Sequence, residues 1–87
     1  MPSFEVLVEV RHRPGIADPA GATIERSLPT LGFAGMSGVH VGKAIRLTVV
    51  AADADDAAAQ VNNLCRRFLI NPVIEDAFVT VEAGVSP

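Results

Sequence analysis

The sequence has 87 residues and a formal net charge of −3 at pH 7, and 49% of its residues are hydrophobic. A chain of this length forms one domain, so we expect residues 1–87 to fold as a single unit with a loose tail at residues 83–87. The negative charge excludes nucleic acid as the main partner, because binding phosphates requires clustered Lys and Arg side chains.

The first predicted element is a strand over residues 4–11. Every second side chain in this segment is apolar, which predicts one face packed on a core: Phe4, Val6, Val8 and Val10. Pro14 and Gly15 form turns and end the element.

A helix is predicted to begin at Asp18. The Asp18 carboxylate can accept a backbone N–H as the N-cap, and Pro19 fits the first helical position. Because Pro29 lacks a backbone N–H and crowds the preceding turn, we expect a kink or the end of the helix near Leu28, with Gly32 closing the element. Three apolar residues at helical spacing predict one buried stripe: Ile24, Leu28 and Leu31.

Residues 39–50 carry apolar side chains at odd positions and leave two alternatives open. A three-residue hairpin loop at residues 42–44 pairs Val41 with Ile45 and keeps the apolar face intact. A two-residue turn at Gly42 and Lys43 would instead place Arg46 among valines. A single long bent strand preserves the alternation as well as the three-residue loop does, so the sequence is compatible with either.

Residues 53–70 give the strongest helix prediction. Three aspartates stand at the start of this segment and two arginines stand near its end, so both ends complement the helix dipole. Asn71 and Pro72 stop the helix. Four residues form the predicted inward stripe: Val61, Leu64, Cys65 and Phe68.

A last strand is predicted over residues 73–82. One of its faces carries Val73, Ala77, Val79 and Val81, and the other carries Ile74 and Phe78. Because the helices cover only one face of the sheet, the second apolar face indicates a partner. The high apolar content of so short a chain indicates the same, and we expect a homodimer or tetramer.

Together the elements predict an α+β fold. The architecture is a small ferredoxin-like-related β-α-β-(β)-α-β two-layer sandwich. One antiparallel sheet is expected to carry two helices on one face, and the chain is expected to dimerise through this sheet.

The polar residues do not form a pattern that is sufficient for catalysis. His12 and His40 are far apart in sequence, and no Cys/His cluster has metal-ligand spacing. Cys65, the single cysteine, lies on the apolar helix stripe and is expected to be buried and inert. Glu75 and Asp76 are neighbours on a strand and therefore point to opposite faces, which excludes joint acid–base work. We therefore predict no catalytic, cofactor-binding or metal-binding residues.

The location is predicted from three further features. One cysteine excludes an internal disulfide, the first residues lack the pattern of a signal peptide, and no apolar run reaches the roughly 20 residues of a membrane span. We expect a cytoplasmic protein with no membrane partner.

Several segments resemble the PurS family, the small subunit of phosphoribosylformylglycinamidine synthase, also called formylglycinamide ribonucleotide amidotransferase. They lie at residues 14–21, 31–33, 39–45 and 65–76, in the family's order, and Asn-Pro-Val-Ile-Glu-Asp at residues 71–76 is the most specific. The chain departs from the family pattern at three positions. His40 stands in place of an arginine, Ala77 in place of an aromatic residue, and Pro29 interrupts the first helix.

The resemblance implies a non-catalytic subunit of an ATP-dependent glutamine amidotransferase complex in de novo purine (IMP) biosynthesis. Its implied partners are itself, a large synthetase subunit and a glutaminase subunit, which it bridges so that ammonia passes from one to the other. ATP and magnesium are expected on the large subunit and no cofactor on this chain. We expect the partner contacts to involve five residues: Gly42, Lys43, Asn71, Glu75 and Asp76.

Two other functions compete with this interpretation. A small-molecule-binding regulatory module on a ferredoxin-like scaffold would use a glycine-containing turn after the first strand, as at residues 14–18. An acyl-phosphate-hydrolysing enzyme would use Arg11 or Arg13, but the run of small residues that cradles the anion is missing.

Overall fold

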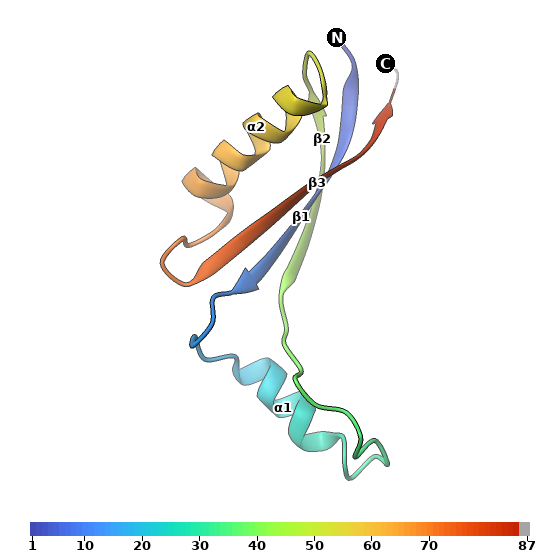
Figure 1. The fold of residues 1–87 in the computed structure, drawn as a ribbon, viewed down its shortest axis with the longest axis vertical. Coiled ribbons are helices and arrows are strands. Elements are labelled where there is room, and N and C mark those ends of the chain that lie inside the picture. Colours follow the sequence, from blue (N-terminus) through green and yellow to red (C-terminus); the bar gives the residue numbers. More distant parts are fainter. Residues whose placement is uncertain (86–87) are drawn as a thin grey trace.

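The computed structural model of the chain describes residues 1–85, with side chains described through residue 82. Three strands, β1 (Ser3–His12), β2 (Lys43–Val50) and β3 (Glu75–Val85), form one antiparallel sheet in the order β2-β1-β3 (Figure 1). Helix α1 (Pro19–Ser27) connects β1 to β2. Helix α2 (Ala54–Leu64), which continues into the π-helical turn η1 (Cys65–Leu69), connects β2 to β3. The α+β class is confirmed, and residues 1–85 contain no strand beyond these three.

The two helices are placed differently because their connections differ. β2 and β3 run in the same direction on either side of β1, so the connection between them must return along the sheet, and α2 packs across one face (Figure 1). β1 and β2 are antiparallel neighbours, so their connection needs no crossover. α1 therefore lies beyond the end of the sheet, and the prediction of two helices on one face was wrong for α1.

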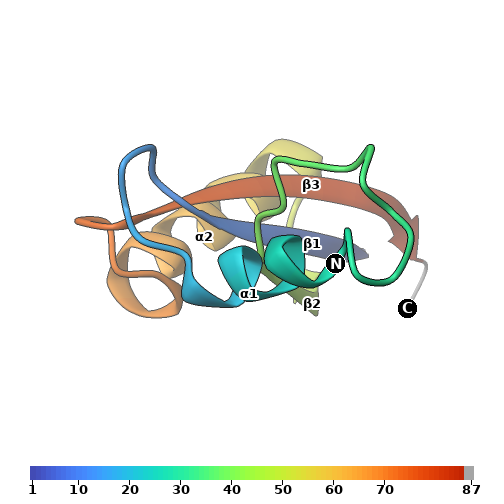
Figure 2. The ribbon, with the colours of Figure 1, turned by 90° about the horizontal axis from the view of Figure 1, so that it is seen from below.

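The chain is elongated as a result. Its principal extents are 52 × 28 × 14 Å and its radius of gyration is 16.7 Å, against about 12 Å for a compact domain of this length. We call residues 13–42, which form the extension beyond the sheet, the arm. Within the arm, the segment that follows α1 folds back beside it (Figure 2).

The core lies between the sheet and α2. Val6, Val8 and Val10 of β1 are almost fully buried, as the alternating pattern predicted. Five more residues complete the buried cluster: Val49, Ala51, Ala57, Val61 and Cys65. The cluster contains no side chain of the arm, and Ile24 and Leu31 are 46% and 67% exposed. The stripe predicted on the first helix therefore exists but is not buried within one chain.

The end of α2 departs from a regular α-helix. In η1 the N–H of Ile70 donates to the carbonyl of Cys65 at 3.1 Å, a hydrogen bond that spans five residues instead of four. The extra residue makes this turn wider than an α-helical one and rotates the side chains within it. Phe68 is consequently 79% exposed, while Leu69 and Ile70 pack against the core. Cys65 and Val61 were correctly placed inward, and Phe68 was not.

The segment before β2 forms neither a hairpin nor part of a strand. Residues 39–42 are extended but unpaired with the sheet, and β2 begins at Lys43. From there Ile45, Leu47 and Val49 face the core, as predicted. Gly42 marks the entry to the sheet, since a Cβ at this position would collide with the carbonyl oxygen of Val10.

The last strand is longer than predicted at its C-terminal end and shorter at its start. Val73 lies before the strand and is 76% exposed, whereas Ala77, Val79 and Val81 pack on the core. The backbone of β3 continues through residue 85 and pairs Gly84 with Phe4, so residues 83–85 are not a loose tail. Residues 86 and 87 of the predicted tail lie outside the described part.

The sheet face opposite α2 is more polar than predicted. Arg46 and Glu82 form an ion pair of 2.8 Å across β1, and the Thr48 hydroxyl donates to Glu5 at 2.7 Å. Phe78 is 46% exposed on this face, and the Arg11 guanidinium lies 4.3 Å from its ring centroid. A cation over an aromatic ring is a favourable arrangement, so the exposed ring of Phe78 is partly covered by a side chain of its own chain.

Candidate functional site

The residues predicted to contact partners lie near one end of the sheet. β2 and β3 both start at this end, so Lys43 and Glu75 are brought close together although 32 positions separate them (75 − 43). The Lys43 ammonium nitrogen is 3.9 Å from Oε2 of Glu75. Asp76, the next residue of β3, forms an ion pair of 3.2 Å with Arg13 of the arm.

Glu75 and Asn71 hold the turn before β3. The Asn71 backbone N–H donates to Oε1 of Glu75 at 2.8 Å, and the Glu75 N–H donates to the Asn71 carbonyl at 2.8 Å. Oδ1 of Asn71 accepts from the N–H of Val73 at 3.1 Å. The Glu75 side chain is only 12% exposed. Two of the five candidate residues therefore have a structural role, which sequence spacing alone did not reveal.

Lys43 keeps most of its surface free. Its side chain is 63% exposed and extends from the first residue of a strand, directly after the tightly packed Gly42. A cation on a rigid strand is ordered in advance, so it loses less conformational entropy on binding than one on a mobile loop. Among the five candidates, Lys43 has the geometry best suited to contact an acidic group on a partner.

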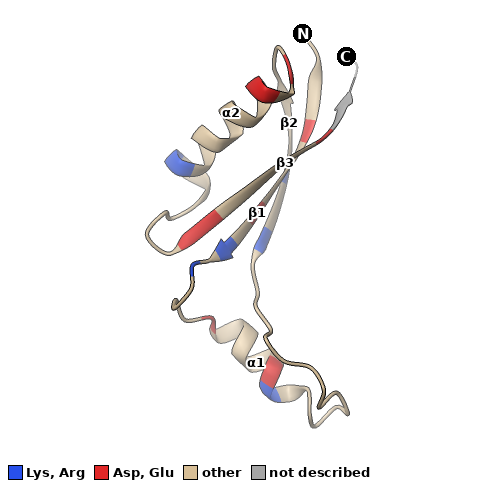
Figure 3. Cartoon of the chain, in the orientation of Figure 1, with Lys and Arg blue, Asp and Glu red and all other residues tan. Residues whose placement is uncertain are grey.

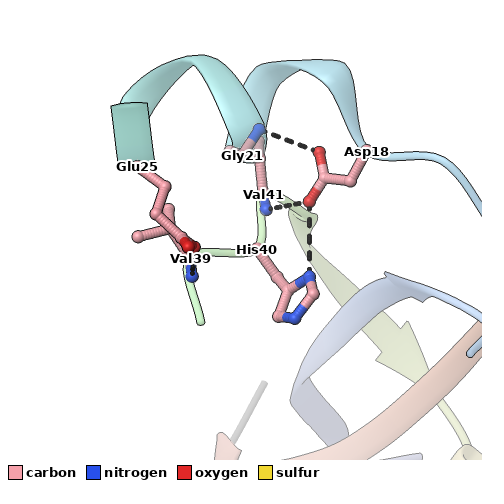
Figure 4. Close-up of polar contacts among 6 residues, drawn as sticks. All are labelled: Asp18, Gly21, Glu25, Val39, His40 and Val41. Atoms are coloured by element: carbon pink, nitrogen blue, oxygen red, sulfur yellow. Dashed lines mark hydrogen bonds and ion pairs between the residues drawn. The ribbon is translucent and has the colours of Figure 1, made fainter. Parts of the chain in front are cut away.

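A second group of polar contacts shapes the arm. Oδ1 of Asp18 accepts the N–H of Gly21 at 3.0 Å, which is the predicted N-cap of α1. Oδ2 of the same carboxylate accepts the N–H of Val41 at 2.9 Å and lies 3.6 Å from Nδ1 of His40 (Figure 4). Glu25 adds a parallel contact, because its Oε1 accepts the N–H of Val39 at 2.9 Å. Two carboxylates of one helix thus bind the extended segment that leads into β2.

The hydrogen bonds to Asp18 stabilise its charged form. Donation from the Gly21 N–H and then from the Val41 N–H holds the pKa of this carboxyl below its ordinary value of 3.8. Desolvation opposes this effect and is the smaller influence, and His12 and His40 add a small attraction. Asp18 therefore stays ionised, and keeps both contacts, throughout the neutral range.

A hollow of about 430 Å³ lies between the arm and the end of the sheet. Its charged lining is largely paired within the chain, since Arg11 contacts Glu9 at 2.8 Å and Arg13 contacts Asp76. The hydrogen bond to Arg11 lowers the pKa of Glu9. The loop that includes Gly15 and Asp18, which the regulatory-module hypothesis singled out, borders the hollow. The two arginines that line the hollow are thus already paired with carboxylates, so they do not form a preorganised cradle for an anionic ligand.

Among the side chains that the structure describes, the remaining reactive groups do not assemble into a reaction centre. Cys65 is 1% exposed, and burial raises the pKa of its thiol, which disfavours the thiolate. Over residues 1–85, no cluster of three or more His, Cys, Asp or Glu side chains is arranged to hold a metal ion. In the same range, no helix is both long and apolar enough to cross a membrane.

Comparison with known proteins gives one consistent result. The family model for PurS, phosphoribosylformylglycinamidine (FGAM) synthase, matches residues 5–83. The chain is 36% identical to the phosphoribosylformylglycinamidine synthase subunit PurS of Synechocystis sp., over 98% of this chain and 88% of that protein. These matches do not favour the two competing interpretations, a small-molecule-binding regulatory module and an acyl-phosphate-hydrolysing enzyme.

Solved structures agree with the sequence match. The PurS subunit of Thermotoga maritima superposes with a TM-score of 0.86 at 33% identity, covering 93% of each chain. A chain in the structure of PurLQS from T. maritima gives a TM-score of 0.86 at 34% identity, covering 94% of this chain and 100% of that one. On both sequence and fold, the chain belongs to the PurS family of phosphoribosylformylglycinamidine synthase.

Proposed function

We propose that this chain is the non-catalytic small subunit of a phosphoribosylformylglycinamidine synthase complex in de novo purine biosynthesis. The observation that carries the proposal is the match to the PurS family over residues 5–83, which extends to a chain of the T. maritima PurLQS structure. The chain would bridge a large ATP-using synthetase subunit and a glutaminase subunit, and so support the passage of ammonia between them.

The contribution of such a subunit is positional. Holding two active sites in a fixed relation, with water excluded between them, raises the effective concentration of an intermediate that would otherwise be diluted. The sheet packs against α2, and the contacts of Asp18 and Glu25 fix the arm. The chain is therefore a rigid, elongated body suited to contact two partners. ATP and magnesium would belong to the large subunit, and the complex would work in the cytoplasm.

Self-association is part of the proposal. The arm carries four large apolar side chains that are roughly half exposed or more, namely Ile24, Leu31, Phe33 and Met36. They leave more apolar surface open than a short monomer normally tolerates. A second copy of the chain would cover this surface, alone or together with the sheet, in a homodimer or tetramer. Light scattering at a protein concentration of tens of micromolar should give the mass of a dimer or a tetramer of the 9.1 kDa chain. A strict monomer would contradict this part of the proposal.

The subunit role is tested by binding. The purified chain should be captured by tagged synthetase and glutaminase subunits, and all three should elute together from a sizing column. The experiment is done with and without glutamine and a nucleotide, so that binding that depends on substrate is also detected. Failure to bind either subunit under every condition would overturn the proposed function.

A further inference from the structure

One side of α2 faces away from the sheet, and no other element of residues 1–85 lies over it (Figure 1). The buried side of the helix carries Ala57, Val61 and Cys65. Asp55 and Arg66 are both exposed and are 11 positions apart (66 − 55), which is about three turns at roughly 3.6 residues per turn. The two charges therefore share the outward side, separated by about 16 Å along the helix axis.

Opposite charges thus stand at the two ends of this outward side. Figure 3 shows the acidic start of α2 and the basic end in η1. The ion pairs found among residues 1–82 include neither Asp55 nor Arg66. A helix with this charge pattern is complementary to a copy of itself that runs in the opposite direction, because each end then meets the opposite charge. A parallel copy would bring like charges together.

From this arrangement we propose that α2 pairs with α2 of a second copy of the chain, in an antiparallel contact about a two-fold axis. Asp55 of one copy lies opposite Arg66 of the other. The two-fold axis repeats this ion pair at the far end of the contact, so all four charges are matched.

The register set by these ion pairs places compatible side chains between and beyond them. It brings Ala59 of one copy opposite Asn62 of the other, and both residues are exposed. The small Ala59 leaves room for the Asn62 amide, which can donate and accept hydrogen bonds across the axis. Phe68, which is 79% exposed, would cover the exposed Ala54 at the start of the other helix. Burial of this ring supplies the apolar contribution that exposed ion pairs lack.

The proposal deepens the self-association part of the proposed function and rests on it. The arm and α2 lie on different parts of the molecule, so a contact through α2 leaves the arm free for its own contact (Figure 1). One short helix pair is a small interface and would be the weaker of the two. Two different two-fold contacts, through the arm and through α2, together give a tetramer.

Sedimentation equilibrium of the whole chain at low salt tests the pairing with charge reversals. Asp55→Arg places arginine against arginine at both ends of the contact, and Arg66→Asp places carboxylate against carboxylate. Each change alone should raise the dissociation constant of the assembly about tenfold or more, and less at high salt. An equimolar mixture of the two variants restores opposite charges and should recover the wild-type mass.

The matched control is the chain that carries both changes, Asp55→Arg with Arg66→Asp. Its net charge equals that of the wild type and its helix ends are again complementary, so it should assemble like the wild type. If the single changes acted only by weakening the helix, the double variant would assemble no better than they do. Circular dichroism should show that all variants fold, because both side chains are exposed.

The outcomes separate this contact from the subunit role. Single variants that keep the wild-type mass, or a double variant that stays dissociated, would overturn the pairing alone. A wild-type chain that sediments as a monomer would overturn the pairing together with the proposed self-association. Capture by the synthetase and glutaminase subunits is measured separately, and a chain that pairs through α2 but is captured by neither would overturn the subunit role and leave the pairing supported.

Discussion

Asp18 binds the backbone of Val41, 23 positions further along the chain, through a hydrogen bond of 2.9 Å. The same carboxylate caps α1 through Gly21. One side chain therefore fixes both the start of the helix and the segment that returns to the sheet. Because the arm does not share the buried core, these polar contacts and that of Glu25 determine its shape.

Replacing Asp18 with alanine should loosen the arm without unfolding the sheet. Amide hydrogen exchange at Gly21 and Val41 should accelerate by about tenfold, the effect expected from losing a capping group, while exchange at Val6 and Val8 stays slow. Asp53→Ala removes the equivalent cap of α2, where Oδ1 of Asp53 accepts from the Asp56 N–H, and should leave Val41 unaffected. Unchanged exchange at Val41 in Asp18→Ala would contradict this account.

The same contact should depend on pH in the acid range only. The pKa of Asp18 is lowered in the folded chain, so its contribution to stability is fully present at pH values above the ordinary 3.8 and disappears as the pH falls through the folded value. The 13C chemical shift of the Asp18 carboxyl carbon, followed by NMR, should therefore show a titration midpoint below 3.8. A midpoint above 3.8 would show that the carboxylate is not held by these bonds.

Cys65 should react slowly with thiol reagents under native conditions, because it is 1% exposed and its thiol pKa is raised by burial. Cys65→Ser should lower the free energy of unfolding by about 1 kcal/mol or more, since it buries a hydroxyl among apolar groups. Cys65→Ala is the control, because it removes the sulfur without adding a polar group. Rapid labelling of the folded protein would contradict the burial on which this prediction depends.

Lys43→Ala should leave folding and self-association intact, as changes at exposed positions normally alter stability by no more than about 0.5 kcal/mol. We expect it to weaken assembly with the partner subunits, more strongly at low salt, where screening is least. Lys43→Arg retains the charge and should assemble normally. Titrations of activity against subunit concentration that coincide for Lys43→Ala and wild type at low salt would show that Lys43 is only an exposed strand residue.

The sequence predicted the elements that repeat a simple pattern. Val6, Val8 and Val10 alternate cleanly, Asp18 is a recognisable N-cap, and three aspartates mark the start of the second helix, so β1 and both helix starts were correctly placed. Local propensity and local hydrogen bonds determine these features, and each can be recognised within a few residues.

Features that the hydrophobic pattern does not encode were missed. The helical stripe of Ile24 and Leu31 predicts burial, but nothing in its spacing says whether the covering surface belongs to the same chain. The outward rotation of Phe68 depends on one hydrogen bond of Ile70, which periodicity cannot show. For the candidate site, the sequence left Lys43 either in a hairpin loop or within a bent strand, and the structure makes it the first residue of β2. The turn held by Glu75 and Asn71 depends on side-chain and backbone hydrogen bonds that the residue pattern did not indicate.

The central claim, that this chain links ammonia release to its use, is tested by comparing two activities of the reconstituted complex. Synthetase activity with added ammonium should need only the large subunit, whereas activity with glutamine should rise steeply as this chain is titrated in and reach a plateau at a fixed ratio of subunits. Glutamine-dependent activity that is equally high without the chain would contradict the claim.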